Sequence, residues 1–162
     1  MKNIWKTGVL FMVSALTLNA QLRTPQASPK ASVSQTIGIT DISISYHRPG
    51  VNNRKIWGGL VPYNQIWRVG ANENTTISFS TPVKIEGNDL SAGTYGFHAI
   101  PGEQEWTMIF SKNSTSFGSY FYDQKEDALR IKVKPEAEDV TERLSFSFRN
   151  LTANSASVVM SW

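Results

Sequence analysis

Residues 42–47 read ISISYH, and residues 144–149 read LSFSFR. In both stretches an apolar side chain alternates with a polar one, so that the period is two residues. Such alternation is typical of a β-strand that buries one face and leaves the other in water. Both stretches therefore predict β-strands.

The same alternation recurs between these two stretches. Short runs with an apolar residue at every second position occur at residues 76–80, 83–85, 95–99, 106–110, 129–134 and 156–162. Turn-forming segments rich in Gly, Pro, Asn and Asp separate the runs, and only residues 123–128 have a helical character. The sequence therefore predicts one all-β domain of about nine short antiparallel strands, a β-sandwich or jelly-roll-like fold, with a closed barrel as the alternative.

The N-terminus has the layout of a secretory signal peptide. Lys2 and Lys6 precede a mostly apolar run at residues 7–18, and the tripeptide LNA at 18–20 offers a cleavage site. The apolar run is too short to span a bilayer comfortably. We therefore predict a signal peptide at residues 1–20, a flexible leader at 21–31 and the β-domain at 32–162. We expect a periplasmic or secreted protein without stable membrane insertion after cleavage.

Composition excludes several classes of function. The chain of 162 residues has 16 basic and 13 acidic residues, and loss of residues 1–20 removes two lysines and leaves 14 against 13. A nearly neutral mature protein is not expected to bind nucleic acid through its overall charge. The chain has no cysteine, which excludes disulfides, thiolate metal ligands and cysteine nucleophiles.

The stretch from residue 46 to 73, YHRPGVNNRKIWGGLVPYNQIWRVGANE, is where we expect a binding site. It holds four basic residues and only one carboxylate, Glu73, while four glycines and two prolines fix the corners of the backbone. Guanidinium groups match the geometry of carboxylate and phosphate, and aromatic rings stack on sugars. The candidate ligand-binding residues are Tyr46, Arg48, Arg54, Trp57, Trp67, Arg68, Asn72 and Glu73.

The arginines and the tryptophans of this stretch could each have a ligand-binding role or a structural role. The arginines could converge on an anion, or one of them could pair with Glu73 and clamp two loops together. Trp57 and Trp67 could stack on sugar rings, or they could plug the open end of the sandwich.

The sequence has few motifs that indicate catalysis or metal binding. The chain has no GxSxG or P-loop motif, and its two histidines, His47 and His98, lack the HxH or HExxH spacing of a zinc site. We therefore predict no metal and no cofactor. The candidate catalytic residues are Glu73 and His98, which could form an acid/base pair only if the fold brings them together.

Several long motifs suggest a family. The segments YHRPG (46–50), RKIWG (54–58), WRVGANE (67–73) and AGTY (92–95) resemble the DUF2911 family of exported bacterial proteins, over about residues 28–162. The resemblance implies an envelope or secreted protein of a Gram-negative, mostly Bacteroidetes-type bacterium. It implies no activity, because none is assigned to the family.

These observations lead to three hypotheses about function. We expect a non-enzymatic module of the bacterial envelope that binds a small polar or anionic ligand or a glycan. The alternatives are a hydrolase-like enzyme that uses Glu73 and His98 as acid and base, and a periplasmic protein-interaction or scaffold domain. Whether the candidate side chains converge on one open site distinguishes the hypotheses.

Overall fold

The computed structural model describes residues 24–162, so the predicted signal peptide and the first three residues of the predicted leader lie outside the described residues. The described part contains ten strands and one 3₁₀ turn. They are β1 (Lys30–Ile37), β2 (Thr40–His47), β3 (Thr76–Phe79), β4 (Val83–Ile85), β5 (Asn88–Leu90), β6 (Gly93–Ile100), β7 (Trp106–Ser111), η1 (Gln124–Glu126), β8 (Asp127–Val133), β9 (Ser145–Arg149) and β10 (Ser157–Ser161).

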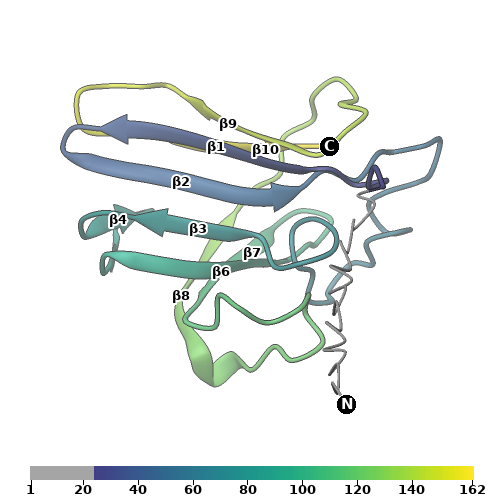
Figure 1. The fold of residues 1–162 in the computed structure, drawn as a ribbon, viewed down its shortest axis with the longest axis horizontal. Coiled ribbons are helices and arrows are strands. Elements are labelled where there is room, and N and C mark those ends of the chain that lie inside the picture. Colours follow the sequence, from purple (N-terminus) through teal and green to yellow (C-terminus); the bar gives the residue numbers. More distant parts are fainter. Residues whose placement is uncertain (1–23) are drawn as a thin grey trace, which may run out of the picture.

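Six strands form the main antiparallel sheet, in the order β1-β2-β3-β6-β7-β8 (Figure 1). The hairpins β9–β10 and β4–β5 form two small antiparallel sheets. This arrangement confirms the prediction of an all-β, sandwich-like antiparallel fold. Within the described residues, no helix is long and apolar enough to cross a membrane.

Two details differ from the sequence-based boundaries. Strand β1 begins at Lys30, so the last two residues of the predicted leader belong to the sheet. Strand β5 was not expected, because two of its three residues, Asn88 and Asp89, are ordinarily turn formers. It pairs with β4 across a tight turn in which Glu86 and Gly87 have positive φ values of 47° and 79°.

The core lies between the main sheet and the β9–β10 hairpin. On the inner face of the sheet, Ile44 pairs with Ile77 across β2 and β3, and Phe97 pairs with Phe110 across β6 and β7. From the hairpin, the buried ring of Phe146 packs 6.2 Å from that of Phe97. The alternation seen in the sequence therefore places one apolar face of every main strand toward the same core.

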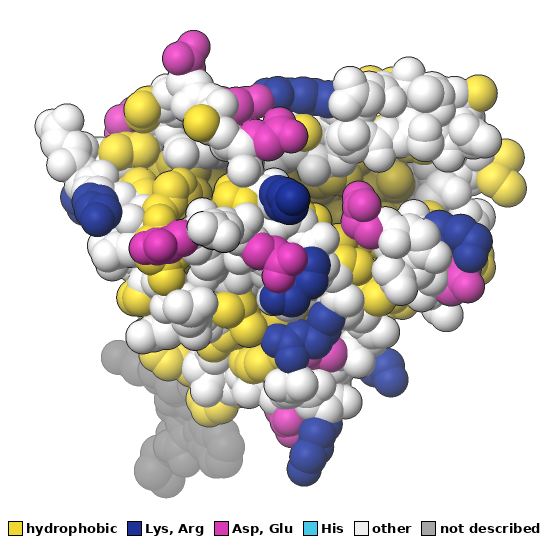
Figure 2. Space-filling model, turned by 180° about the vertical axis from the view of Figure 1, so that it is seen from behind, with side chains coloured by type: hydrophobic (Ala, Val, Ile, Leu, Met, Phe, Trp, Pro, Cys, Tyr) yellow, Lys and Arg dark blue, Asp and Glu magenta, His cyan; other side chains and the backbone are white. Residues whose placement is uncertain are grey.

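The second layer is narrower than the first, because two strands of the β9–β10 hairpin face a six-stranded sheet. The core-facing side chains of β10 are consequently only partly covered, and Val158 is 40% exposed. Figure 2 shows a hollow with hydrophobic side chains in it on one face of the molecule, between patches of basic and acidic side chains.

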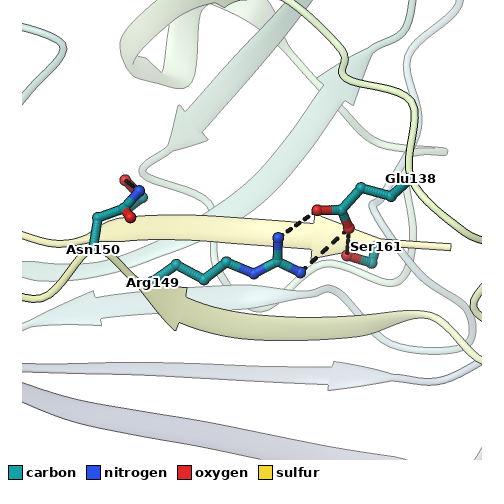
Figure 3. Close-up of polar contacts among 5 residues, drawn as sticks. Glu138, Arg149, Asn150 and Ser161 are labelled. Carbon is teal, nitrogen blue, oxygen red and sulfur yellow. Dashed lines mark hydrogen bonds and ion pairs between the residues drawn. The ribbon is translucent and has the colours of Figure 1, made fainter.

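The connection from β8 to β9 is fastened to the outer side of this hairpin (Figure 3). Both terminal nitrogens of Arg149 donate hydrogen bonds to the Glu138 carboxylate, which also accepts one from Ser161 Oγ at 3.1 Å. The Arg149 guanidinium and the Ser161 hydroxyl together hold the pKa of Glu138 below its usual value. Because the group is exposed, this contact positions the connection and adds little to stability.

A matched pair of isoleucines tests the position of the core. Ile44 is fully buried, whereas Ile39 in the β1–β2 turn is 88% exposed. Ile44→Ala should lower the free energy of unfolding by about 2–5 kcal/mol because it leaves a cavity, and Ile39→Ala should change it by less than about 0.5 kcal/mol. Urea denaturation followed by tryptophan fluorescence measures both, and equal losses would contradict the fold.

Candidate functional site

Two of the predicted site arginines are engaged by backbone carbonyl groups. Arg48 Nε donates a hydrogen bond to Leu144 O at 2.9 Å, which joins the end of β2 to the start of β9. Arg54 donates from Nε to Val51 O at 3.0 Å and from Nη2 to Gly50 O at 2.5 Å, within its own loop. These two arginines therefore hold backbone segments in place and do not converge on an open cavity.

The single carboxylate of the stretch pairs with a histidine. Glu73 Oε2 lies 3.1 Å from Nε2 of His47, whose side chain is buried while that of Glu73 remains largely exposed. No arginine of the described chain forms an ion pair with Glu73. The structure thus brings Glu73 to His47 and not to His98, with which the sequence suggested an acid/base pair.

Tyr46 and Asn72 also make contacts within the fold. Tyr46 is buried in the core, where its hydroxyl accepts a hydrogen bond from Phe146 N at 3.1 Å and its ring packs edge-on against Phe146 at 4.8 Å. Asn72 donates from Nδ2 to Ser28 O at 3.3 Å, beside the start of β1. Both side chains therefore join segments that are distant in sequence.

The tryptophans of the stretch form an aromatic cluster. Trp57 packs edge-on against Trp67, Trp106 and Trp162, with centroids 5.5, 4.6 and 5.9 Å apart, and Trp67 stacks on Trp162 at 5.9 Å. Trp57 and Trp67 are partly buried against the hydrophobic core. Their ring faces are therefore occupied by one another, and little of them is free to stack on a sugar.

The opposite face of the main sheet carries a row of buried polar side chains, His47, Asn74 and His98, called here the polar row. The hydrogen bond from Phe97 N to Thr75 O at 2.8 Å extends the β3–β6 pairing, which places Asn74 beside His98. His47 lies at the corresponding end of β2. Three polar residues on neighbouring strands are thus buried on the side away from the core.

Residues 112–123, called here the cover loop, lie against Asn74 and His98 of this row. The loop connects β7 to η1 and, in Figure 1, lies at the lower end of the molecule, away from β9 and β10. Asn74 Nδ2 donates a hydrogen bond to Ser116 Oγ at 3.0 Å, and His98 Nδ1 lies 3.2 Å from Ser119 Oγ. At the end of the loop, Tyr122 OH donates to Asp127 Oδ2 at 2.6 Å. Three polar contacts therefore fix the loop to the sheet.

Several buried polar atoms on this face have no hydrogen-bond partner in the protein. They are His47 Nδ1, Asn74 Oδ1, Asp127 Oδ1 and Arg130 Nε, although Arg130 Nε forms an ion pair with Asp127 Oδ2 at 3.5 Å. The β6–β7–β8 pairing places Arg130 two strands from His98 on the same face. Buried polar atoms are usually satisfied, so a group of such exceptions on one face marks it as a candidate site.

Burial shifts the pKa values of the titratable groups beneath the cover loop. It lowers the pKa of His98 to about 4, so that the imidazole is neutral near pH 7. Burial also raises the pKa of Asp127 above its usual value, and the pKa of Tyr122 is raised by burial and by its hydrogen bond to Asp127. The positive charge at this face therefore comes from arginine and not from His98.

Arg68, the third predicted arginine, reaches the edge of the cover loop. Backbone hydrogen bonds of 2.8 and 2.9 Å pair Trp67 with Ala99, so Arg68 follows on the side of the sheet that carries the polar row. A Cβ placed on Gly118 would lie 2.5 Å from Arg68 Nη1 and 3.5 Å from Tyr120 Cδ2. The guanidinium of the half-buried Arg68, the glycine and the exposed Tyr120 ring thus meet at one place, called here the Arg68–Tyr120 site.

The guanidinium of Arg68 makes no hydrogen bond and no ion pair with any residue in the range 24–162. Arg68 is among the candidate residues predicted from the sequence, but the cover loop that lies against it was not predicted. The signal for that loop was SFGSYFY at residues 116–122, which holds four aromatic residues without the alternation of a strand.

A separate groove of about 640 Å³ lies farther along the same face of the sheet. Hydroxyl side chains line much of it, including Ser34, Ser43, Ser78 and Thr94. The Ser43 and Ser78 hydroxyls lie 2.7 Å apart and bond to each other. The groove contains none of the predicted site residues and no basic side chain.

The burial of His98 predicts a pH dependence of stability. Its pKa falls from 6.5 in the unfolded chain to about 4 in the folded protein, so the unfolded state binds more protons between these values. The stability from neutral His98 is complete above the unfolded pKa and is lost as pH falls toward the folded one, by on the order of 3 kcal/mol.

Urea denaturation at pH 7 and pH 4.5 measures this loss, and His98→Gln is the control that isolates it from titrating carboxylates. The variant should lose less stability than the wild type over the same interval. An NMR titration that placed the His98 midpoint at 6 or higher would contradict the expectation.

Comparison with known proteins places the chain in a family. A family model described as a protein of unknown function, DUF2911, matches residues 28–162. Searches of curated proteins and of solved structures each found no match. The match covers both the stretch from residue 46 to 73 and the cover loop, and the chain belongs to the DUF2911 family.

Proposed function

We propose that this protein is a non-enzymatic binding module, exported to the bacterial periplasm or beyond, that holds a small anionic ligand at the Arg68–Tyr120 site. The observation that carries the proposal is the guanidinium of Arg68, a half-buried residue, which contacts Gly118 and has no acceptor among the described residues. A guanidinium offers five N–H donors in a planar fork that suits carboxylate or phosphate.

The charges around Arg68 support an anionic ligand. Glu73, the carboxylate nearest to it in sequence, is engaged by His47 and is not paired with any arginine. His98 is neutral near pH 7 because burial lowers its pKa to about 4. Partial burial strengthens the attraction between a guanidinium and an anion, since less water screens the two charges.

The contacts of the two candidate catalytic residues favour binding over hydrolysis. Glu73 faces His47, whereas His98 lies 3.2 Å from the Ser119 hydroxyl. A serine beside a histidine is the geometry of a nucleophile and its base. A base with a pKa of about 4 is, however, a weak acceptor for a serine proton at neutral pH. The His98–Ser119 contact therefore supports an anchor for the cover loop.

Substitution of Arg68 tests the proposed site. Phosphate and acetate, titrated separately into the protein that lacks the predicted signal peptide, should raise its melting temperature by roughly 9 °C at about 100-fold excess over Kd. Arg68→Gln should abolish the rise because it removes the cation. Arg54→Gln is the control, since that arginine is exposed and bonded within its own loop. Unchanged stabilisation of Arg68→Gln would contradict the proposal.

A pair of glycines separates binding from stability. Gly118 and Gly87 both have positive φ values, 65° and 79°. A side chain added at Gly118 would collide with Arg68, whereas one added at Gly87 would meet no atom within 4 Å. Alanine at either position should cost about 1 kcal/mol of stability through backbone strain.

Only Gly118→Ala should weaken anion binding, because its methyl group must displace the guanidinium. Isothermal titration calorimetry with phosphate compares the two variants after their stabilities have been measured. Equal affinities for phosphate would show that the guanidinium position does not matter, which would count against the site.

A further inference from the structure

We infer that the ligand of the Arg68–Tyr120 site is an acidic sugar, whose ring stacks on the exposed aromatics of the cover loop while its carboxylate binds Arg68. This inference rests on the proposed function and adds the chemical class of the ligand. Three features of the cover loop carry it: exposed rings, the adjacent cation and free hydroxyl groups.

The cover loop exposes aromatic rings although the loop itself is anchored. Phe117, Tyr120 and Phe121 are 55, 79 and 73% exposed. Their neighbours Ser116 and Ser119 are fixed to the sheet by contacts with Asn74 and His98. Large apolar side chains left in water are unfavourable, and three of them within five residues of one anchored loop are available to contact a ligand. Rings held on an anchored loop lose little freedom when a flat apolar surface stacks on them.

The cation lies directly beside these rings. A Cβ built on Gly118 would lie close to both Arg68 Nη1 and Tyr120 Cδ2. The guanidinium and the edge of the ring are therefore neighbours. A ligand ring that stacks on Tyr120 therefore brings a substituent within reach of Arg68. A carboxylate on that ring would accept two parallel hydrogen bonds from the guanidinium.

Hydroxyl groups complete the chemistry of the loop. Ser114, Thr115 and the Tyr120 hydroxyl make no side-chain hydrogen bond with any described residue. Each can donate and accept, as sugar hydroxyls do. A simple anion would use only Arg68, and an aromatic carboxylate would leave these hydroxyls unused. An acidic sugar engages the Tyr120 ring and the Arg68 cation together, and its hydroxyls match the hydroxyl groups of the same loop.

The charge of the cover loop favours a sugar over a lipid surface. Residues 112–123 hold one basic residue, Lys112, and one acidic residue, Asp123. Exposed aromatics that dock on anionic membranes are normally accompanied by an excess of lysine and arginine. The loop has no such excess. The observations therefore support one contact, between the Arg68 guanidinium and a single carboxylate of the ligand.

The test is calorimetric titration of the protein without its predicted signal peptide. The probes are trigalacturonic acid, a neutral galactose trisaccharide and inorganic phosphate. The acidic trisaccharide should bind at least tenfold more tightly than either other probe. Tyr120→Ala should weaken its binding about tenfold, a clearly larger loss than it causes for phosphate. Ile39→Ala, which removes an 88% exposed side chain elsewhere, should change neither affinity.

The outcomes distinguish this inference from the proposed function. If phosphate binds through Arg68 but the acidic trisaccharide binds no more tightly, the ligand class is wrong and the function stands. If no probe binds, both are wrong. Equal binding of the neutral trisaccharide, or an acidic-sugar affinity insensitive to Tyr120→Ala, overturns the inference. Tyr120-dependent sedimentation with phosphatidylglycerol vesicles, without sugar binding, also overturns it in favour of a lipid surface.

Discussion

Strand β6 is buried on both of its faces, and the rest of the structure depends on that burial. Tyr95, Phe97 and Ala99 point into the core, whereas Gly96 and His98 lie beneath the cover loop. At residue 96 a side chain would collide with the backbone carbonyl of Asn113, so the close approach of the loop requires glycine. The inner face gives the domain its hydrophobic core. The outer face positions the loop that carries the candidate site. Strand β6 therefore contributes both to the stability of the fold and to the proposed binding site.

The strands could be predicted from the sequence because alternation is a local signal that needs no knowledge of distant partners. Main strands such as β2 and β6 follow from it, and long motifs indicated the family. The partners of the arginines could not be predicted, since they lie far away along the chain. Arg48 bonds to Leu144 and Arg68 contacts Gly118, separations that no spacing rule within residues 46–73 reveals. The cover loop lacked a period altogether, and its place over β6 follows only from the folded sheet.

The charge of the stretch at residues 46–73 has different physical roles at different positions. Arg48 and Arg54 donate to carbonyl groups, where a cation stabilises the ends of backbone segments. His47 pairs with Glu73, the single carboxylate of the stretch. What remains is one half-buried arginine at the rim of a polar face. The candidate site is thus smaller than the sequence suggested, and its aromatic part comes from the cover loop because the tryptophans pack among themselves.

The narrow second layer has a consequence for how the molecule behaves when it is concentrated. Strand β10 has a hydrogen-bonded neighbour among the described strands on one side only, and its five residues, SVVMS, carry no charge and no proline. Lysine, proline and bulges are the usual features that keep an edge strand from pairing with another molecule, and β8 at the margin of the main sheet carries Arg130 and Lys132. Strand β10 is therefore an uncharged edge that can pair with another molecule, and a lysine introduced there should reduce self-association when the protein is prepared at high concentration.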